Sequence, residues 1–540
     1  MAKNYLAGVF GKPAASTPVT DQTKEHQVRN EAGGFVYSAD GWTLLSRFLI
    51  LGSEGGSYYA GELKMARENA RSVEALIQAD GLRVVRTIVE VSRAGRAPKN
   101  DPALFALAMC ASFGDAPTRA AALAALPEVA RIGTHLFTFA EFLDGMRGWG
   151  RGVRAAVGKW YTDKPAVDVA FQVAKYGQRN GWSHRDLLRL AHPKVAQGSA
   201  HDAVFHYATK GWESVGETPH PDRDLVLLWA LERLRQPLNE AEVLKLIDDY
   251  RLPMELIPSE KQTAAVYERM VETAGLTWLI RNLGNLSKQG VLTAGQFEGI
   301  RRVVARIIDR DAIRKARVHP LAILVAAKTY GRGAGVRSGG SWAVVPQIVE
   351  ALDDAFEAAF QNVEPAGKRF VLGLDISGSM SWPAIAGMPG ITPMIGTAAM
   401  ALITARTERS VTSMAFQTQF VPFPIGRRDS LSTVVTNMET ASRFMGATDC
   451  SLPMTWALKN KVQADAFVVY TDSQSWVGGH PDRALETYRQ RMGIDAKLIV
   501  CAMVANRFTI GDPNDPNTLS VAGFDTATPS LISQFAAGRL

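Results

Sequence analysis

The sequence predicts a protein of two unlike halves, an α-solenoid followed by a doubly wound α/β domain. Three observations carry this prediction. Residues 27 to about 340 read as successive amphipathic helices joined by short connections containing Gly, Pro, Asp or Ser. After residue 369, apolar strands alternate with helices, which is the pattern of a parallel sheet covered on both faces. Two of those strands end in an acidic residue, Asp375 and Asp472.

The composition is that of a globular chain with two or three domains. Of the 540 residues, 46% are hydrophobic and 21% are charged, so a large core can form. No apolar run reaches the roughly 18 residues of a membrane span, and residues 1–21 lack the apolar core of a signal peptide. We therefore expect a cytoplasmic protein. Cys110, Cys450 and Cys501 are too few and too far apart for a disulfide framework or a zinc cluster.

The first half begins with a predicted flexible arm over residues 1–26, which is rich in Ala, Thr, Pro and Lys. A helical domain is expected over residues 27–345. Helix pairs that cover each other's apolar faces form a curved solenoid. An amphipathic linker helix is expected within residues 346–368. The first helices of the domain are predicted at 42–51, 60–79, 82–92, 102–112 and 118–125.

The second half, residues 369–540, is expected to form the α/β domain. Its predicted strands are 370–374, 413–421, 465–472 and 497–504, and its predicted helices are 393–408, 451–459, 484–492 and 529–535. Strands joined through helices in this way pair in parallel. This order of elements predicts a doubly wound sheet.

Oxygen-bearing side chains follow the predicted strands. Asp375, Ser377 and Ser379 come directly after one strand, Asp472 ends another, and Thr448 lies in a loop between them. Because the carboxyl ends of neighbouring strands converge at one edge of such a sheet, these five side chains can meet. Their hard oxygen atoms suit octahedral Mg²⁺. The alternative is that the two serines cap the next helix and that Asp472 is an ordinary turn residue.

Positive charge is concentrated in two helical segments, although the net charge is only +7. Residues 147–194 contain ten Lys or Arg and three acidic residues, and residues 301–337 contain ten and two. The rest of the chain is therefore acidic. Such a distribution is the electrostatic footprint of a protein that binds a polyanion.

In the first basic segment, Ser183 is expected to begin a helix whose open N-terminus, beside His184 and Arg185, binds phosphate. Four interleaved aromatic residues offer stacking surfaces for bases. A solvated face of Arg and His is the alternative. The nucleic-acid-binding residues predicted here are Arg151, Arg154, Lys175, Arg179, His184, Arg185 and Arg189.

In the second basic segment, Arg302, Arg306, Arg310 and Arg314 recur every four residues. On one continuous helix they would form a single stripe. Like charges at this spacing repel each other unless an anion lies across them, so we expect RNA phosphate there. A solvated face relieved by neighbouring aspartates is the alternative.

Several long motifs occur in order along the chain, at residues 52–59, 135–139, 175–190, 281–284, 316–320, 446–453 and 523–525. Together they resemble the Ro 60 kDa autoantigen family, from about residue 27 to the C-terminus. The resemblance implies a TROVE module of HEAT-like repeats closed as a ring, and a von Willebrand A domain. The metal-ion-dependent adhesion site of such domains corresponds to the five oxygen-bearing residues above. An Arg- and Ala-rich chain without eukaryotic targeting features resembles a bacterial member of the family.

The resemblance implies a non-catalytic RNA-binding scaffold. Family members hold small noncoding Y RNA on a basic outer surface and the single-stranded 3′ end of misfolded RNA in the ring, and bacterial relatives are associated with 3′ to 5′ exoribonucleases. We expect the same partners here, a role in RNA quality control, maturation or decay, a bound Mg²⁺ and a monomer. His184 carries over to the Y RNA surface of the family.

Two other functions compete with this interpretation. The first is a protein-adhesion scaffold whose metal accepts a Glu or Asp of a partner, without a direct role in RNA. The second is a metal-dependent hydrolase, which is disfavoured because no general base accompanies Asp375 in a motif.

Overall fold

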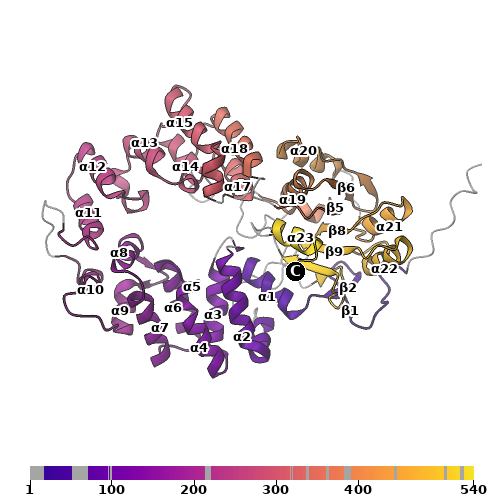
Figure 1. The fold of residues 1–540 in the computed structure, drawn as a ribbon, viewed down its shortest axis with the longest axis horizontal. Helices are drawn as coiled ribbons and strands as arrows, with labels where there is room; N and C mark the ends of the chain where they lie inside the picture. Colours follow the sequence, from indigo (N-terminus) through magenta and orange to yellow (C-terminus); the bar gives the residue numbers. More distant parts are fainter. Residues whose placement is uncertain are drawn as a thin grey trace, which may run out of the picture. The chain divides into compact units, whose positions relative to one another are not determined.

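The structure, a computed structural model, has two compact units (Figure 1). One unit combines Val363–Leu540 with the chain up to Ser72, and the other is Val73–Asn362. The described residues are 17–51, 71–94, 96–97, 100–212, 220–316, 318, 320–335, 340–359, 364–381, 391–442, 447–503, 508–522 and 528–539.

The first unit is built on a six-stranded sheet of order β11-β9-β8-β5-β6-β7. Its strands are β5 (Arg369–Asp375), β6 (Ser410–Phe416), β7 (Phe420–Pro422), β8 (Ala466–Thr471), β9 (Lys497–Ala502) and β11 (Thr518–Ala522). All pairings are parallel except that of β6 with β7. The central strands are apolar throughout because helices cover both faces.

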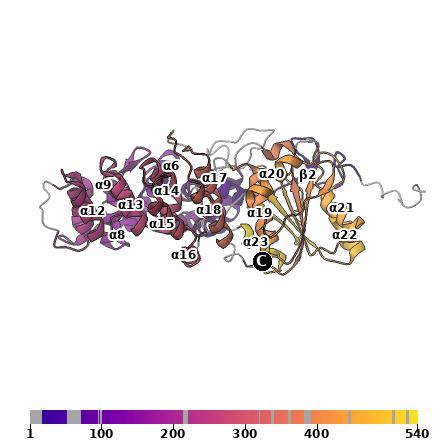
Figure 2. The same ribbon diagram turned by 90° about the horizontal axis from the view of Figure 1, so that it is seen from above.

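These helices form two layers. Figure 2 shows α19 (Pro393–Thr407), α20 (Leu431–Ala441) and α23 (Thr528–Ala536) on one side of the sheet. On the other side lie α21 (Leu452–Lys459) and α22 (Pro481–Met492). The core beneath α21 and α22 includes Phe416, Phe467 and Tyr488. The predicted α/β domain with strands alternating with helices is confirmed.

The predicted strand 413–421 is wrong, because this segment turns back on itself as β6 and β7. The Gln417 backbone N–H donates to the Gln419 carbonyl at 3.1 Å, and Phe416 pairs with Phe420 across the turn. Two apolar stretches interrupted by three polar residues therefore make a hairpin. Its second strand is the antiparallel edge of the sheet.

The N-terminal segment belongs to the unit that contains the sheet. Its strands β1 (Gln27–Arg29) and β2 (Phe35–Ser38) form a small antiparallel sheet with β10 (Phe508–Thr509). Helix α1 (Gly41–Leu51) packs near β11. The Arg47 guanidinium, fully buried, donates to the Phe508 carbonyl at 2.9 Å.

This placement changes the predicted boundaries. From residue 17 onward the chain is docked, since the Val19 N–H donates to the Gly478 carbonyl at 2.8 Å. The predicted arm over residues 1–26 therefore ends earlier, and its first 16 residues lie outside the described part. The helical unit begins at Val73 rather than at residue 27.

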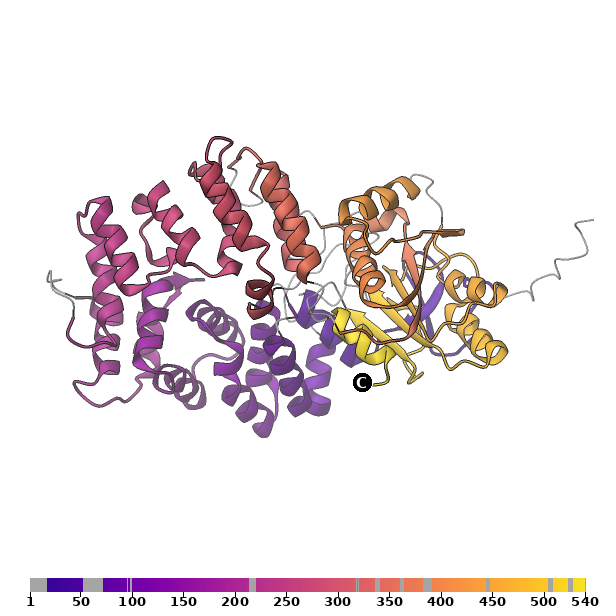
Figure 3. The same ribbon diagram turned by 45° about the horizontal axis from the view of Figure 1, so that its top comes forward.

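The second unit consists of helices that pack against their neighbours (Figure 3). They are α2 (Arg71–Arg93), α3 (Asp101–Phe113), α4 (Ala116–Ala124), α5 (Leu126–Val129), α6 (Gly133–Met146), α7 (Arg151–Thr162), α8 (Ala166–Lys175), α9 (His184–Ala191), α10 (Ala200–Lys210), α11 (Val226–Arg235), α12 (Glu240–Tyr250), α13 (Ala264–Thr273), α14 (Leu276–Lys288), α15 (Phe297–Ile307), α16 (Arg310–Lys315), α17 (Pro320–Gly331) and α18 (Pro346–Ala359). The predicted helical half is confirmed. Its closure into a ring stays a prediction.

Two details refine this half. The predicted break between two helices near residue 80 is present, because Asp80 has non-helical dihedral angles inside α2. The Asp80 side chain accepts from the Arg83 N–H at 3.0 Å and so caps the second part. The predicted linker helix exists as α18, but it packs on α15, α16 and α17 and is part of the helical unit.

Candidate metal centre and nucleic-acid interface

The acidic strand ends meet at one edge of the sheet. Strands β5 and β8 are parallel neighbours, with Leu374 opposite Tyr470. Asp375 is the last residue of β5, and Asp472 follows the last residue of β8. Both side chains are buried, with at most 1% exposed. The parallel register therefore brings two carboxylates together below the surface, as the sequence predicted.

Hydroxyl groups surround these carboxylates. The Ser377 N–H donates to Asp375 Oδ1 at 2.9 Å, and the Ser377 and Ser379 Oγ atoms are 3.1 Å apart. Thr471 Oγ1 donates to Asp375 Oδ2 at 2.7 Å, a contact that the sequence analysis missed. Thr471 ends an apolar strand, so nothing in the sequence distinguishes it from an ordinary strand residue. Against the larger effect of burial, the Ser379 side chain lowers the pKa of Asp472.

Thr448 lies in the loop before α21, and this loop is tied to the segment after Asp472. Its carbonyl oxygen accepts from the Trp476 N–H at 3.2 Å and from Ser475 Oγ at 3.3 Å. The Thr448 side chain is 4% exposed. All five predicted metal-site residues are therefore buried on three loops at the carboxyl edge of the sheet.

The electrostatics of this edge favour a cation. Burial raises the pKa of Asp375, and the neighbouring Asp472 charge raises it further. Burial likewise raises the pKa of Asp472. A divalent cation would remove this repulsion between two desolvated carboxylates. The donor set is composed of hard oxygens, which suits Mg²⁺.

The hydroxyls are needed if an ion is held here. In the described part of the chain, no three His, Cys, Asp or Glu side chains lie close enough together to hold a metal. Asp375 and Asp472 would therefore share the ion with the oxygens of Ser377, Ser379 and Thr448. This set of two carboxylates and three hydroxyl oxygens fits a magnesium ion. A bound Mg²⁺ would supply positive charge to a carboxylate that reaches the edge of the sheet.

Cys450, which follows the Thr448 loop, is a packed thiol. Its side chain is fully buried and its Sγ lies 3.8 Å from Thr471 Oγ1. Burial raises the pKa of this thiol well above its usual value. Cys110 and Cys501 are buried as well, which is consistent with inert core cysteines.

The predicted role of His184 is wrong, because its side chain is 3% exposed. Tyr161 hydrogen-bonds to its Nδ1 at 2.8 Å, and its Nε2 lies 3.2 Å from the Gln172 carbonyl. Burial lowers the pKa of His184 to about 4, so the ring is neutral at pH 7. His184 therefore joins α7, α8 and α9 and does not face phosphate.

The helix that follows is not an open phosphate site either. Ser183 and Asp186 form a reciprocal capping box at the start of α9, so the backbone N–H of Asp186 already has an acceptor. Before it, β3 (Gln178–Arg179) and β4 (Trp182–Ser183) form a hairpin through Asn180 and Gly181, both with positive φ. The Asn-Gly dipeptide is the signal that would have predicted this turn.

Other predicted nucleic-acid residues in this segment already have acidic neighbours. Lys175 lies 3.2 Å from Glu255, and Arg179 lies 3.7 Å from Asp101. Among the interleaved aromatic residues, Trp160 is fully buried and belongs to the core. These three residues are therefore weaker candidates for direct contact.

The predicted stripe on the second basic segment does not exist as one helix. Helix α15 ends at Ile307 and α16 begins at Arg310. Asp309 stands between them and caps α16 by accepting from two backbone N–H groups at 2.9 and 3.0 Å. A change of helix after Ile307 breaks the four-residue repeat on which the prediction rested.

The four arginines of the predicted stripe also have partners. Arg302 lies 3.0 Å from Glu272, and Arg314 lies 2.7 Å from Asp311. Arg306 donates to the Ala274 carbonyl at 2.6 Å and also to the Val271 carbonyl. Arg310 likewise has a partner. The predicted stripe therefore does not present unpaired cations, because acids or carbonyls already contact Arg302, Arg306 and Arg314. The pairing of Arg314 with Asp311 agrees with the alternative of a face relieved by neighbouring aspartates.

The remaining predicted cations form the stronger candidate surface. Arg151 and Arg154 are exposed on α7, and Arg185 and Arg189 are exposed on α9. The two helices pack against each other. Within the described part of the chain, none of the four has an acidic side chain at ion-pair distance. Lys159, also exposed on α7, adds to this surface, which we call the α7–α9 surface.

No helix in the described ranges is both long and apolar enough to cross a lipid bilayer.

Comparisons with known proteins cover both units. The TROVE domain family matches residues 28–332, and the Ro60 vWA domain family matches residues 369–536. An RNA-binding protein RO60 of Deinococcus radiodurans is 42% identical over 525 residues, which are 97% of this chain and 98% of that protein. An RNA-binding protein RO60 of Caenorhabditis elegans is 32% identical, over 96% of this chain and 91% of that protein.

A solved structure is similar over nearly the whole chain. The crystal structure of the Deinococcus radiodurans RO (RSR) protein has a TM-score of 0.74 and 40% sequence identity. The similarity covers 93% of this chain and 100% of that chain.

Proposed function

This chain belongs to the Ro60 family, and from that membership we propose that it binds RNA through the α7–α9 surface. The relatives at 42% and 32% identity are named RNA-binding proteins. The observation that carries the assignment to α7 and α9 is the set of exposed arginines without acidic partners. A cation that is already paired with an acidic side chain contributes little binding free energy when a phosphate arrives. An unpaired cation releases counterions from the RNA and so contributes more.

The spacing of these arginines suits a phosphate backbone. Arg151 and Arg154 are three residues apart and Arg185 and Arg189 four apart, so each pair lies on one face of its helix. Guanidinium groups bind phosphate through paired hydrogen bonds. Such contacts position a folded RNA without reading its sequence. The surface therefore suits a structured RNA better than a specific sequence.

The finer assignments are part of the same proposal. The RNA would be a small noncoding Y-like RNA, with single-stranded 3′ ends of misfolded or precursor RNA held in a ring. The protein would serve RNA quality control, maturation or decay beside a 3′ to 5′ exoribonuclease, as a non-catalytic cytoplasmic monomer. These points rest on family resemblance.

A charge-reversal experiment tests the surface. Arg185→Glu together with Arg189→Glu should weaken binding of a structured small RNA by about 10- to 100-fold at 0.15 M salt. The slope of the logarithm of the binding constant against the logarithm of the salt concentration should also decrease in magnitude by about two. The matched control, Arg302→Glu with Arg314→Glu, has the same charge change on paired arginines of the same unit. Equal losses in both variants, or no loss in the first, would contradict the assignment.

We also propose that the sheet edge binds Mg²⁺ and that a carboxylate of a partner protein completes the coordination of the ion. The buried pair of Asp375 and Asp472 among hydroxyls supports this second function. Asp375→Asn should abolish Mg²⁺ binding in calorimetry and leave RNA affinity within about twofold. RNA incubated with the protein and Mg²⁺ should stay intact. Cleavage that disappears in Asp375→Asn would instead support an enzyme.

A further inference from the structure

The turn between β1 and β2 is held against the segment that follows Asp472. The Asn30 side chain donates to the Ser475 carbonyl at 2.8 Å and accepts from the Gly34 N–H at 2.9 Å. The Ala32 N–H donates to Gln474 Oε1 at 3.3 Å. A Cβ built at Gly34 would overlap the Ser475 carbonyl oxygen. The turn is therefore fitted closely to one conformation of this segment.

Gln474 connects the turn to the candidate metal site. Its side chain is 1% exposed. Its backbone N–H donates to Asp472 Oδ1 at 3.2 Å, and its side-chain amide donates to Glu31 Oε2 at 3.1 Å. One buried residue thus holds two carboxylates, one from the sheet edge and one from the N-terminal turn.

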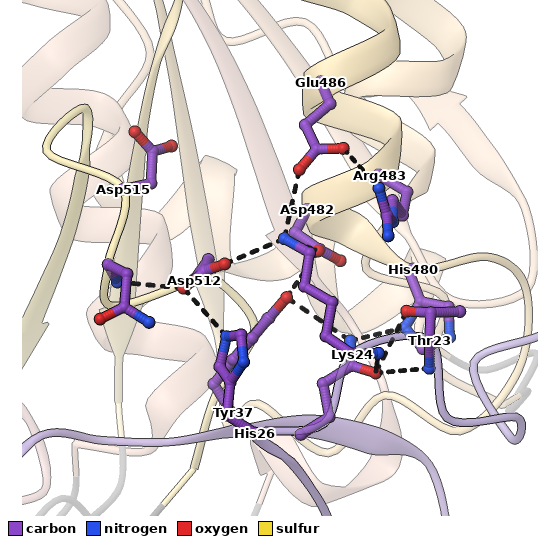
Figure 4. A network of polar contacts seen from close by, with 12 residues as sticks. Thr23, Lys24, His26, Tyr37, His480, Asp482, Arg483, Glu486, Asp512 and Asp515 are labelled. Atoms are coloured by element: carbon purple, nitrogen blue, oxygen red, sulfur yellow. Dashed lines mark hydrogen bonds and ion pairs between the residues drawn. The ribbon is translucent and has the colours of Figure 1, made fainter.

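A second contact holds the N-terminal segment in place (Figure 4). The Lys24 ammonium lies 3.0 Å from Asp482, 3.2 Å from Glu486 and 2.9 Å from Asp512. Burial alone would lower the pKa of Lys24, but hydrogen bonds to the two aspartates raise it overall. Tyr37 of β2 donates to Asp482 at 2.6 Å. The turn that carries Glu31 is therefore anchored through Lys24 before it and Tyr37 after it.

We propose that Glu31 is a third acidic residue of the metal site, placed outside the direct ligands, and that it raises the affinity of the site for divalent cations. This inference rests on the proposed Mg²⁺ site. Asp375 and Asp472 together balance the charge of one divalent ion. Glu31 adds a negative charge that attracts the ion and repels a carboxylate arriving from a partner.

The contacts indicate an electrostatic role rather than direct coordination. No three acidic side chains in the described part lie close enough together to hold one ion, so Glu31 acts across Gln474 or through water. Gln474 links the two carboxylates, since its backbone N–H donates to Asp472 and its side-chain amide donates to Glu31. A negative charge separated from a ligand carboxylate by one residue, Gln474, should change the ion affinity by about three- to tenfold.

Calorimetric titration of the full chain with MnCl₂ and with MgCl₂ tests the inference. Glu31→Gln keeps an oxygen that can accept from Gln474 and removes only the charge, so it should fold normally and bind either ion about three- to tenfold more weakly. Glu31→Lys should lose more affinity for the ion, because it replaces a negative charge by a positive one. The matched control is Glu25→Gln, the same charge change at another exposed residue of the segment, which should bind like wild type.

The outcomes separate this inference from the proposed site. If wild type binds the ion, Asp375→Asn does not, and Glu31→Gln binds as tightly as wild type, the role of Glu31 is overturned and the metal site stands. If wild type and Asp375→Asn give the same titration, both proposals fail. Unfolding curves without metal check the fold, and Glu31→Gln should melt within about 1 °C of wild type, since a loss of structure would shift it by several degrees.

Discussion

Replacing Lys24 tests how strongly the N-terminal segment is bound to the sheet unit. Lys24 is 19% exposed, Asp482 5% and Asp512 14%, so Lys24→Met would leave two largely buried carboxylates without their cation. Removing one partner of a fully buried pair costs about 3–5 kcal/mol, and exposed pairs contribute under about 1 kcal/mol. Glu486, 39% exposed, belongs to the second class. We expect a loss of about 2–3 kcal/mol in the free energy of unfolding.

A loss of this size lowers the melting temperature of a unit of about 250 residues by roughly 5–10 °C. Thermal unfolding followed by circular dichroism measures it. Lys461→Met, at an exposed lysine of the same unit, is the control and should melt like wild type. Asp482→Asn combined with Lys24→Met should recover part of the loss, because the stranded charge is removed. A shift below about 1 °C in Lys24→Met, or an equal shift in the control, would refute the reasoning.

Two further changes test buried contacts of the two units. His184 has a folded-state pKa of about 4, below its ordinary value near 6.5, so the unfolded state binds the proton first as pH falls. Its contribution is complete above about pH 6.5 and is lost down to about pH 4, up to about 3 kcal/mol. Urea unfolding at pH 7 and pH 4.5 should show a smaller acid loss for His184→Gln than for wild type; equal losses would contradict a neutral buried ring. Gly34→Ala should destabilise by about 1–3 kcal/mol because its Cβ meets the Ser475 carbonyl, and an unchanged melting temperature would show that the turn is not held there.

The fold and the convergence of the acidic strand ends could be predicted because both depend on local patterns. Apolar strands alternating with helices specify a parallel sheet, and an acid at the end of a strand specifies an edge. Because β5 and β8 are parallel neighbours, their register places the residues at their carboxyl ends side by side. Thr471 was missed only because its hydroxyl points to Asp375 from a position that reads as ordinary strand.

The nucleic-acid residues were predicted less well because exposure and pairing depend on contacts far apart in sequence. Arg302 meets Glu272 from the opposite helix, thirty residues earlier. His184 is buried beside Tyr161 of α7, to which its Nδ1 is hydrogen-bonded. In the sequence, Asp309 reads only as a charge that reduces the repulsion between the arginines, whereas in the structure it follows the end of α15 and caps α16. Charge density alone therefore does not show which cations of a basic segment are exposed and unpaired.

The family match assigns the N-terminal segment to the TROVE domain, from residue 28 onward, whereas the structure places it in the unit that contains the sheet. The Ro60 vWA domain match begins at residue 369, yet β10 of this unit pairs with β2. A sheet unit cut at residue 369 would lack β2 and leave Asp482 and Asp512 without Lys24. It would also lack Glu31, whose carboxylate Gln474 holds beside Asp472. The compact unit that carries the candidate metal site is therefore made from both ends of the chain.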